Sequence, residues 1–149
     1  MLNDIASAIG KGLLAGLVGT AAMTLSSTLE MKIRGRQASD TPSKAAGKVL
    51  GVQPRNPQGK ARFGSIVHWG YGTAWGGVRG LTALTGLPNP AAALIHFAAV
   101  WGAAQLMLPS LDVSPPISEW SAEEVATDIF HHAVYAAATG AAYDFIERH

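Results

Sequence analysis

The chain has 149 residues, a length that suits a single domain, and a formal net charge of +1 at pH 7. Only 14% of the residues are charged, against ~25% in an ordinary soluble domain. The absence of cysteine excludes disulfides, thiolate chemistry and cysteine-ligated metal sites.

The few charges are concentrated between long runs that lack Asp, Glu, Lys and Arg. A membrane-spanning helix needs ~20 mostly apolar residues, with ~17 as the lower limit. We therefore predict an all-α fold, a four-helix transmembrane bundle that forms one integral membrane domain over residues 1–149. The predicted spans cover residues 12–33, 63–84, 91–111 and 122–146. A soluble bundle is the alternative, but it would need charged outer faces at helical spacing.

The first predicted span, residues 12–33, carries a face of small residues that includes Gly12 and Gly16. Such faces let helix backbones approach closely in lipid. No basic segment precedes its apolar stretch, so we expect no cleaved signal peptide. Residues 34–62 form a basic connector, in which a short helix is predicted to begin near Asp40 and the stretch after Gly51 is predicted to be irregular.

The second span, residues 63–84, repeats glycine every four residues at Gly72, Gly76 and Gly80, which indicates another packing seam. A tight turn, TGLPNP, leads into the third span. An acidic loop follows it, and Ser121 with Glu124 has the spacing of a capping box at the start of the fourth span. The glycine faces predict close contacts between helices, within the chain or between subunits of a homo-oligomer.

Orientation follows from lysine and arginine, which favour the cytoplasmic side. Eight of the eleven lie in residues 32–62: Lys32, Arg34, Arg36, Lys44, Lys48, Arg55, Lys60 and Arg62. The connector is therefore expected in the cytoplasm, and both termini on the other side of the membrane. The acidic loop then lies on the same side of the membrane as the basic connector and could dock against it. Its acidic residues are Asp112, Glu119, Glu123 and Glu124.

Ionisable residues inside a bilayer are costly and usually face the interior in pairs. The predicted topology brings such residues together in the cytoplasmic half of the bundle. The candidate site contains Glu30, His68, Asp128, His131 and His132. Asp128 shares a helix face with both histidines, three and four residues later. Because adjacent helical residues point ~100° apart, only one of the two histidines is expected to face any given partner.

Three further residues form a secondary set. His96 is expected in the outer half of the bundle, and Tyr135 lies one turn after the histidine pair. Arg79 is expected to extend to the outer membrane interface. The alternative for Arg79 is that it lines a pore and selects anions.

Several roles remain open for the candidate site. It could join helices by hydrogen bonds, relay protons or a small ion in a channel- or transporter-like protein, or hold a metal ion through Asp128, His132 and His68. Histidines on two helices could also bind haem. A non-catalytic accessory subunit of a larger membrane complex is a further hypothesis. No enzyme motif or nucleic-acid-binding pattern is present, so we expect no catalytic activity, no cofactor and no nucleic-acid partner.

Three stretches resemble a group of uncharacterised bacterial membrane proteins: AGLVGTAAMTLSSTLEMKIRGRQASDTPSKAAGKVLG, HWGYGTAWGGVRG and FHHAVYAAATGAAYD. More distantly, the layout is similar to the YagU-like family of inner-membrane proteins. The matching features would be Glu30, Pro115 and Pro116, Glu123 or Glu124, and His131 or His132. The resemblance implies an integral membrane protein without an established reaction, and it suggests a broad association with acid tolerance.

Overall fold

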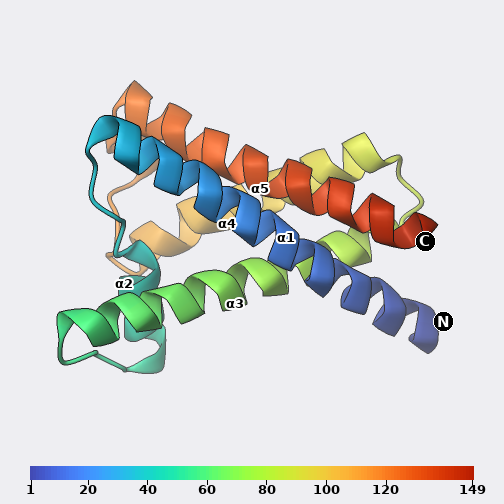
Figure 1. The fold of residues 1–149 in the computed structure, drawn as a ribbon, viewed down its shortest axis with the longest axis horizontal. Coiled ribbons are helices and arrows are strands. Elements are labelled where there is room, and N and C mark those ends of the chain that lie inside the picture. The colour runs from blue at the N-terminus through green and yellow to red at the C-terminus, as the bar shows by residue number, and fades with distance from the viewer.

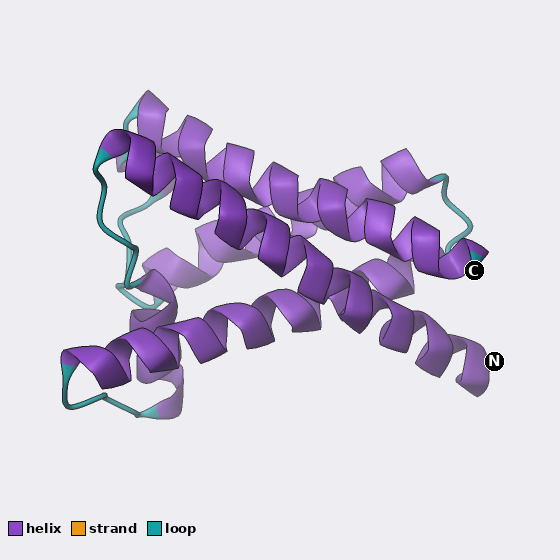
Figure 2. Cartoon of the chain, in the orientation of Figure 1, coloured by secondary structure: helices purple, strands orange, loops and turns teal.

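The computed structural model describes all of residues 1–149 and contains helices and loops only (Figure 2), which confirms the all-α prediction. Five α-helices and one short 3₁₀-helix follow one another along the chain. They are α1 (Leu2–Arg34), α2 (Thr41–Leu50), α3 (Pro57–Ala83), α4 (Asn89–Ser110), η1 (Ile117–Glu119) and α5 (Ala122–Arg148).

The four long helices run alternately in opposite directions (Figure 1). Both chain termini and the turn between α3 and α4 lie at one end, which we call the terminal end. The connector with α2 and the loop between α4 and α5 lie at the other, the connector end. Helix α1 packs against α3 and α5, α4 packs against α5 and α3, and the short α2 lies on α3. This arrangement places the basic connector beside the acidic loop.

Two helix boundaries differ from the sequence prediction. Helix α1 begins at Leu2 instead of residue 12, because nothing in the first ten residues interrupts a helix and the charge of Lys11 is paired with Glu147 on α5 at 3.0 Å. Helix α3 begins at Pro57, inside the stretch predicted to be irregular. There the Asn56 side chain accepts a hydrogen bond from the Gly59 backbone N–H at 2.7 Å, and a proline follows at the first helical position.

Other predicted helix ends are confirmed. Helix α2 ends at Gly51, whose φ of 66° is the left-handed conformation typical of a helix C-terminus. Ser121 and Glu124 form the predicted capping box at the start of α5. The Ser121 hydroxyl accepts from the Glu124 N–H at 3.2 Å, and the Glu124 carboxylate accepts from the Ser121 N–H at 2.8 Å.

The interior of the bundle is made of small and polar side chains. No Leu, Ile, Met, Phe or Trp side chain is buried, and the buried apolar residues are six alanines, one valine and two tyrosines. Large apolar side chains instead cover the outside, including Leu106 at 78%, Ile33 at 76% and Leu25 at 72% exposure. This distribution is the reverse of that expected for a protein in water.

The glycines predicted to pack helices meet each other across α1 and α3. A Cβ atom added to Gly16 would lie 2.8 Å from the Cα of Gly76, and one added to Gly12 would lie 2.9 Å from the Gly80 nitrogen. Gly72 faces Thr20 in the same seam. All five glycines thus make contacts inside one chain. The accessory-subunit and homo-oligomer hypotheses stay predictions.

Two of the helices, α1 and α4, are long and apolar enough to cross a membrane. Helix α1 has 33 residues and α4 has 22, which correspond to ~50 Å and ~33 Å against a hydrocarbon core of ~30 Å. Helices α3 and α5 have 27 residues each but are more polar.

Candidate functional site

The predicted ionisable residues form separate hydrogen-bonded groups near the connector end instead of one cluster. The first group joins α1 to α5. The Glu30 carboxylate accepts from Arg36 Nη2 at 2.6 Å and lies 3.3 Å from Arg34 Nη1. His131 Nε2 lies 3.8 Å from the same carboxylate, and its Nδ1 lies 2.9 Å from the Ser26 hydroxyl. Glu30 thus has two guanidinium groups beside it.

The Ser26 hydroxyl lies between two possible acceptors, the Met23 carbonyl at 3.0 Å and His131 Nδ1 at 2.9 Å. When Ser26 donates its proton to Met23, it accepts from His131 Nδ1. A neutral imidazole carries one proton, so in that tautomer Nε2 has a free lone pair. That nitrogen is buried, has no hydrogen-bond partner and faces the Glu30 carboxylate. If Nε2 then takes up a proton, the His131 imidazolium and the Glu30 carboxylate form an ion pair.

The second group joins α5 to α4 around Asp128. Its carboxylate accepts hydrogen bonds from Trp101 Nε1 at 2.8 Å and Gln105 Nε2 at 3.2 Å. His132 Nδ1 lies 3.4 Å from this carboxylate and donates to the Asp128 carbonyl at 2.9 Å, since a carbonyl can only accept. His131 and His132 therefore contact different residues, Ser26 and Glu30 in one case and Asp128 in the other, as their angular separation predicts.

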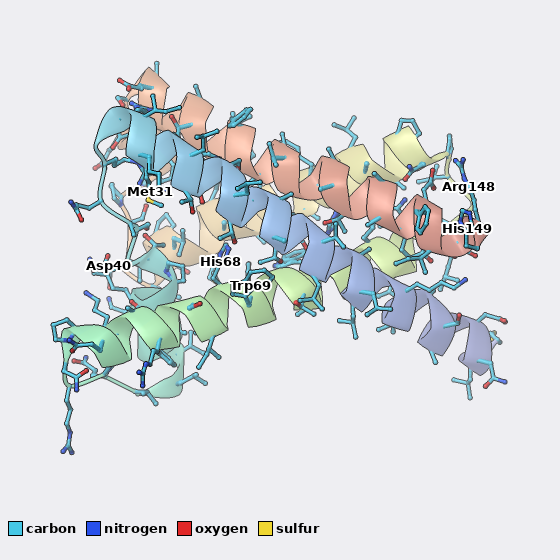
Figure 3. The ribbon with its side chains drawn as sticks, viewed as in Figure 1. Met31, Asp40, His68, Trp69, Arg148 and His149 are labelled. Atoms are coloured by element: carbon cyan, nitrogen blue, oxygen red, sulfur yellow. The ribbon has the colours of Figure 1, made fainter.

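His68 joins α3 to α1, and Figure 3 shows it pointing from α3 toward α1. Its Nε2 lies 3.0 Å from the Thr24 hydroxyl. The Thr24 hydroxyl also lies 2.7 Å from the Thr20 carbonyl, and when it donates there, His68 is the donor to Thr24. His68 makes no direct contact with Glu30 or Asp128, and its hydrogen-bond partner is Thr24. A single site that unites all five predicted residues stays a prediction.

Deeper in the bundle, His96 and Tyr135 fasten α4 and α5 to the α3 backbone. His96 is fully buried and donates from Nε2 to the Trp75 carbonyl at 2.9 Å. The Tyr135 hydroxyl donates to the Gly72 carbonyl at 2.6 Å. The two rings lie 5.5 Å apart. Both residues join helices by hydrogen bonds.

The prediction that Arg79 extends to a membrane interface is wrong. Arg79 is 2% exposed, donates a hydrogen bond to the Asn89 side chain and lies 4.7 Å from the centre of the Tyr143 ring. It is held inside because Gly80 and Gly76, on the same helix, bring α3 directly against α1. Arg79 therefore contacts α4 and α5 at the terminal end.

The side chains proposed as metal ligands do not lie together in the structure. The proposed ligands Asp128, His132 and His68 are not assembled, and no three His, Asp or Glu side chains anywhere in the chain gather as metal ligands. Asp128 instead accepts hydrogen bonds from α4, and His68 is turned toward Thr24.

Ion pairs connect the basic segments to the acidic loop and α5. Lys48 on α2 lies 3.7 Å from the Asp112 carboxylate, and Arg34 pairs with Glu123. Within the connector, Asp40 pairs with Lys44 at 2.9 Å and Lys60 at 2.6 Å, and these ammonium groups lower the pKa of its carboxyl to about 2. The predicted docking is present for Asp112 and Glu123, whereas Glu124 is used in the capping box.

Sequence reasoning did not assign Ser26, Thr24 or Asn89 to the site, and it left Trp101 and Gln105 without a role. A usable signal was present, since Ser26 precedes Glu30 by four residues and Trp101 precedes Gln105 by four. Such pairs share a helix face.

Comparisons of the chain with protein-family models, curated proteins and solved structures give no match. The resemblance to YagU-like proteins stays a prediction.

Proposed function

We propose that the chain is a small multi-pass protein of the bacterial inner membrane, transporter-like, whose Glu30–His131 pair binds and releases a proton. The membrane placement is supported by the inverted surface, because Leu, Ile and Phe side chains face outward on all four long helices while the interior is small and polar. In this proposal α3 and α5 span with α1 and α4, shielding their polar residues within the bundle, and the basic connector lies in the cytoplasm.

The observation that carries the proton-binding role is the buried nitrogen His131 Nε2, which lies 3.8 Å from the Glu30 carboxylate and has no hydrogen-bond partner. A buried polar atom without a hydrogen bond costs free energy. Binding a proton there removes that cost and creates a charge-assisted contact. Imidazole suits the task because it titrates near neutral pH.

The polar groups are arranged for access from the connector end. Along α1, Glu30, Ser26 and Thr24 carry the polar contacts to α3 and α5, and the rise from Thr24 to Glu30 is ~9 Å, about a third of a hydrocarbon core. Beyond Thr20 the Gly16 and Gly12 backbones contact α3 directly, which closes the seam. The arrangement therefore favours transport through one proton site that opens to one side at a time over an open pore.

The test is proton uptake by the purified chain in liposomes that contain a pH-sensitive dye, under an imposed pH gradient. We expect uptake by the wild type and at least a 10-fold loss in Glu30→Gln and His131→Gln. His149→Gln, an exposed histidine near the C-terminus, is the control and should behave like the wild type. Absence of uptake by correctly folded wild-type protein would refute the proposal, and so would full activity in both site variants.

A further inference from the structure

An open groove runs along α1 at the connector end, where this helix lies beside the first turns of α5 (Figure 1). Its volume is about 310 Å³. Residues three and four apart on a helix share one face, so the groove follows α1 from Ser26 to Arg34, a rise of ~12 Å. The lining residues are Ser26, Leu29, Glu30, Ile33 and Arg34 of α1 and Phe130 of α5.

The walls of the groove are apolar and face outward. Leu29, Ile33 and Phe130 are large hydrophobic side chains, and each is more than half exposed. A concave, mostly apolar surface with a few polar groups at fixed positions is typical of a ligand site. In the proposed membrane placement the groove opens toward lipid, and it follows α1, which crosses the bilayer. Its shape and polarity therefore suit an acyl chain.

Cationic side chains surround the end of the groove that lies nearest the connector. Arg34 lines this end, and Lys32 lies in the same last turn of α1. Arg34 is shared by the carboxylates of Glu30 and Glu123, and Arg36 pairs with Glu30. Lys32 is exposed and has no ion pair. Because these three cations face only two carboxylates, one positive charge is left for an anionic ligand.

We propose that this groove binds one anionic phospholipid of the cytoplasmic leaflet. An acyl chain lies along Leu29, Ile33 and Phe130. The phosphate lies beside Lys32 and Arg34, since anionic headgroups attract lysine and arginine at the cytoplasmic surface. Lys32 follows Leu29 by three residues and shares its helix face, so one lipid contacts both. The inference rests on the membrane placement in the proposed function but not on proton binding.

The experiment is native mass spectrometry of the full chain, titrated in detergent with phosphatidylglycerol or with phosphatidylcholine that carries the same acyl chains. We expect one phosphatidylglycerol per chain to bind saturably, about 5-fold more tightly than phosphatidylcholine, the factor that one lysine beside an anionic headgroup provides. In Lys32→Gln this preference should vanish. In Ile33→Trp the indole fills the groove, so both lipids should bind at least ~10-fold more weakly.

Two control variants match these changes at exposed positions outside the groove. Arg62→Gln removes a cation from α3 at the same end of the bundle, and Leu106→Trp adds an indole to the outer face of α4. Both should bind phosphatidylglycerol like the wild type. Ile33 is 76% exposed, so its replacement should leave the fold intact.

Three results would overturn the proposal: equal wild-type affinity for the two lipids, a preference that survives in Lys32→Gln, or unchanged lipid binding in Ile33→Trp. Displacement of the lipid by an excess of inorganic phosphate would also overturn it, because the site would then take a free anion. Proton uptake is measured separately, and Glu30→Gln should lose uptake while it keeps phosphatidylglycerol binding. Failure of lipid binding is thereby distinguished from failure of the proposed function.

Discussion

His131 and His132 are adjacent in the sequence and face different helices. His131 Nδ1 is hydrogen-bonded to Ser26 on α1 and its Nε2 faces Glu30, whereas His132 bonds within α5 to Asp128. The difference arises from the ~100° rotation between neighbouring helical residues. At this scale the Asp128–His132 contact follows from a spacing of four residues, but the Glu30–His131 contact depends on how α1 and α5 pack.

The Asp40 carboxyl provides a prediction for pH. Lys44 and Lys60 lower its pKa to about 2, below the ~3.9 of an unfolded chain. A lowered folded-state pKa contributes stability above pH ~4, which is lost as the pH falls through about 2. NMR titration of the carboxyl carbon should give a midpoint near 2 in the wild type and a higher one in Lys60→Ala. Lys32→Ala, at a lysine without an ion pair, should not change it; a wild-type midpoint near 4 would contradict the structure.

At the scale of elements, the contact between α1 and α3 depends on residues that have no side chain. Gly12 and Gly16 meet Gly76 and Gly80 so closely that the two backbones touch. The four-residue repeat in the sequence predicted a seam of this kind. It did not specify the partner helix, because every glycine face is chemically alike and only the topology decides which faces meet.

Two glycines of α3 provide a matched pair of variants. In Gly76→Ala the new Cβ would lie 2.7 Å from the Gly16 nitrogen, so we expect the free energy of unfolding to fall by ~1–3 kcal/mol. In Gly70→Ala the Cβ meets nothing within 4 Å, and the better helix propensity of alanine should raise stability by ~0.5–1 kcal/mol. Unfolding in mixed micelles with increasing SDS measures both. Equal effects of the two variants on the free energy of unfolding would contradict the close packing of α1 against α3 at Gly76.

At the scale of the whole molecule, the four long helices bury small and polar groups and expose large apolar ones. In water this surface would drive aggregation, whereas in lipid the exposed side chains are solvated. The topology also places the connector and the turn between α3 and α4 at opposite ends of the bundle.

The absence of cysteine makes this topology directly testable. A single cysteine introduced in the connector as Arg55→Cys should react with a membrane-impermeant maleimide only in inside-out vesicles. Thr85→Cys, in the turn between α3 and α4, should react only in right-side-out spheroplasts. Labelling of both positions from the same side would exclude the four-span arrangement.

The sequence alone determined the class of fold, the charge-free runs, the capping box and the face that Asp128 shares with His132, because all of these depend on composition or on spacing within one helix. Tertiary structure decided the partners: Glu30 with His131, His68 with Thr24, and the burial of Arg79 between α4 and α5. The physical reason is that helical periodicity fixes which residues share a face. Which faces meet, and at what depth, depends on how closely the glycines let the helices approach.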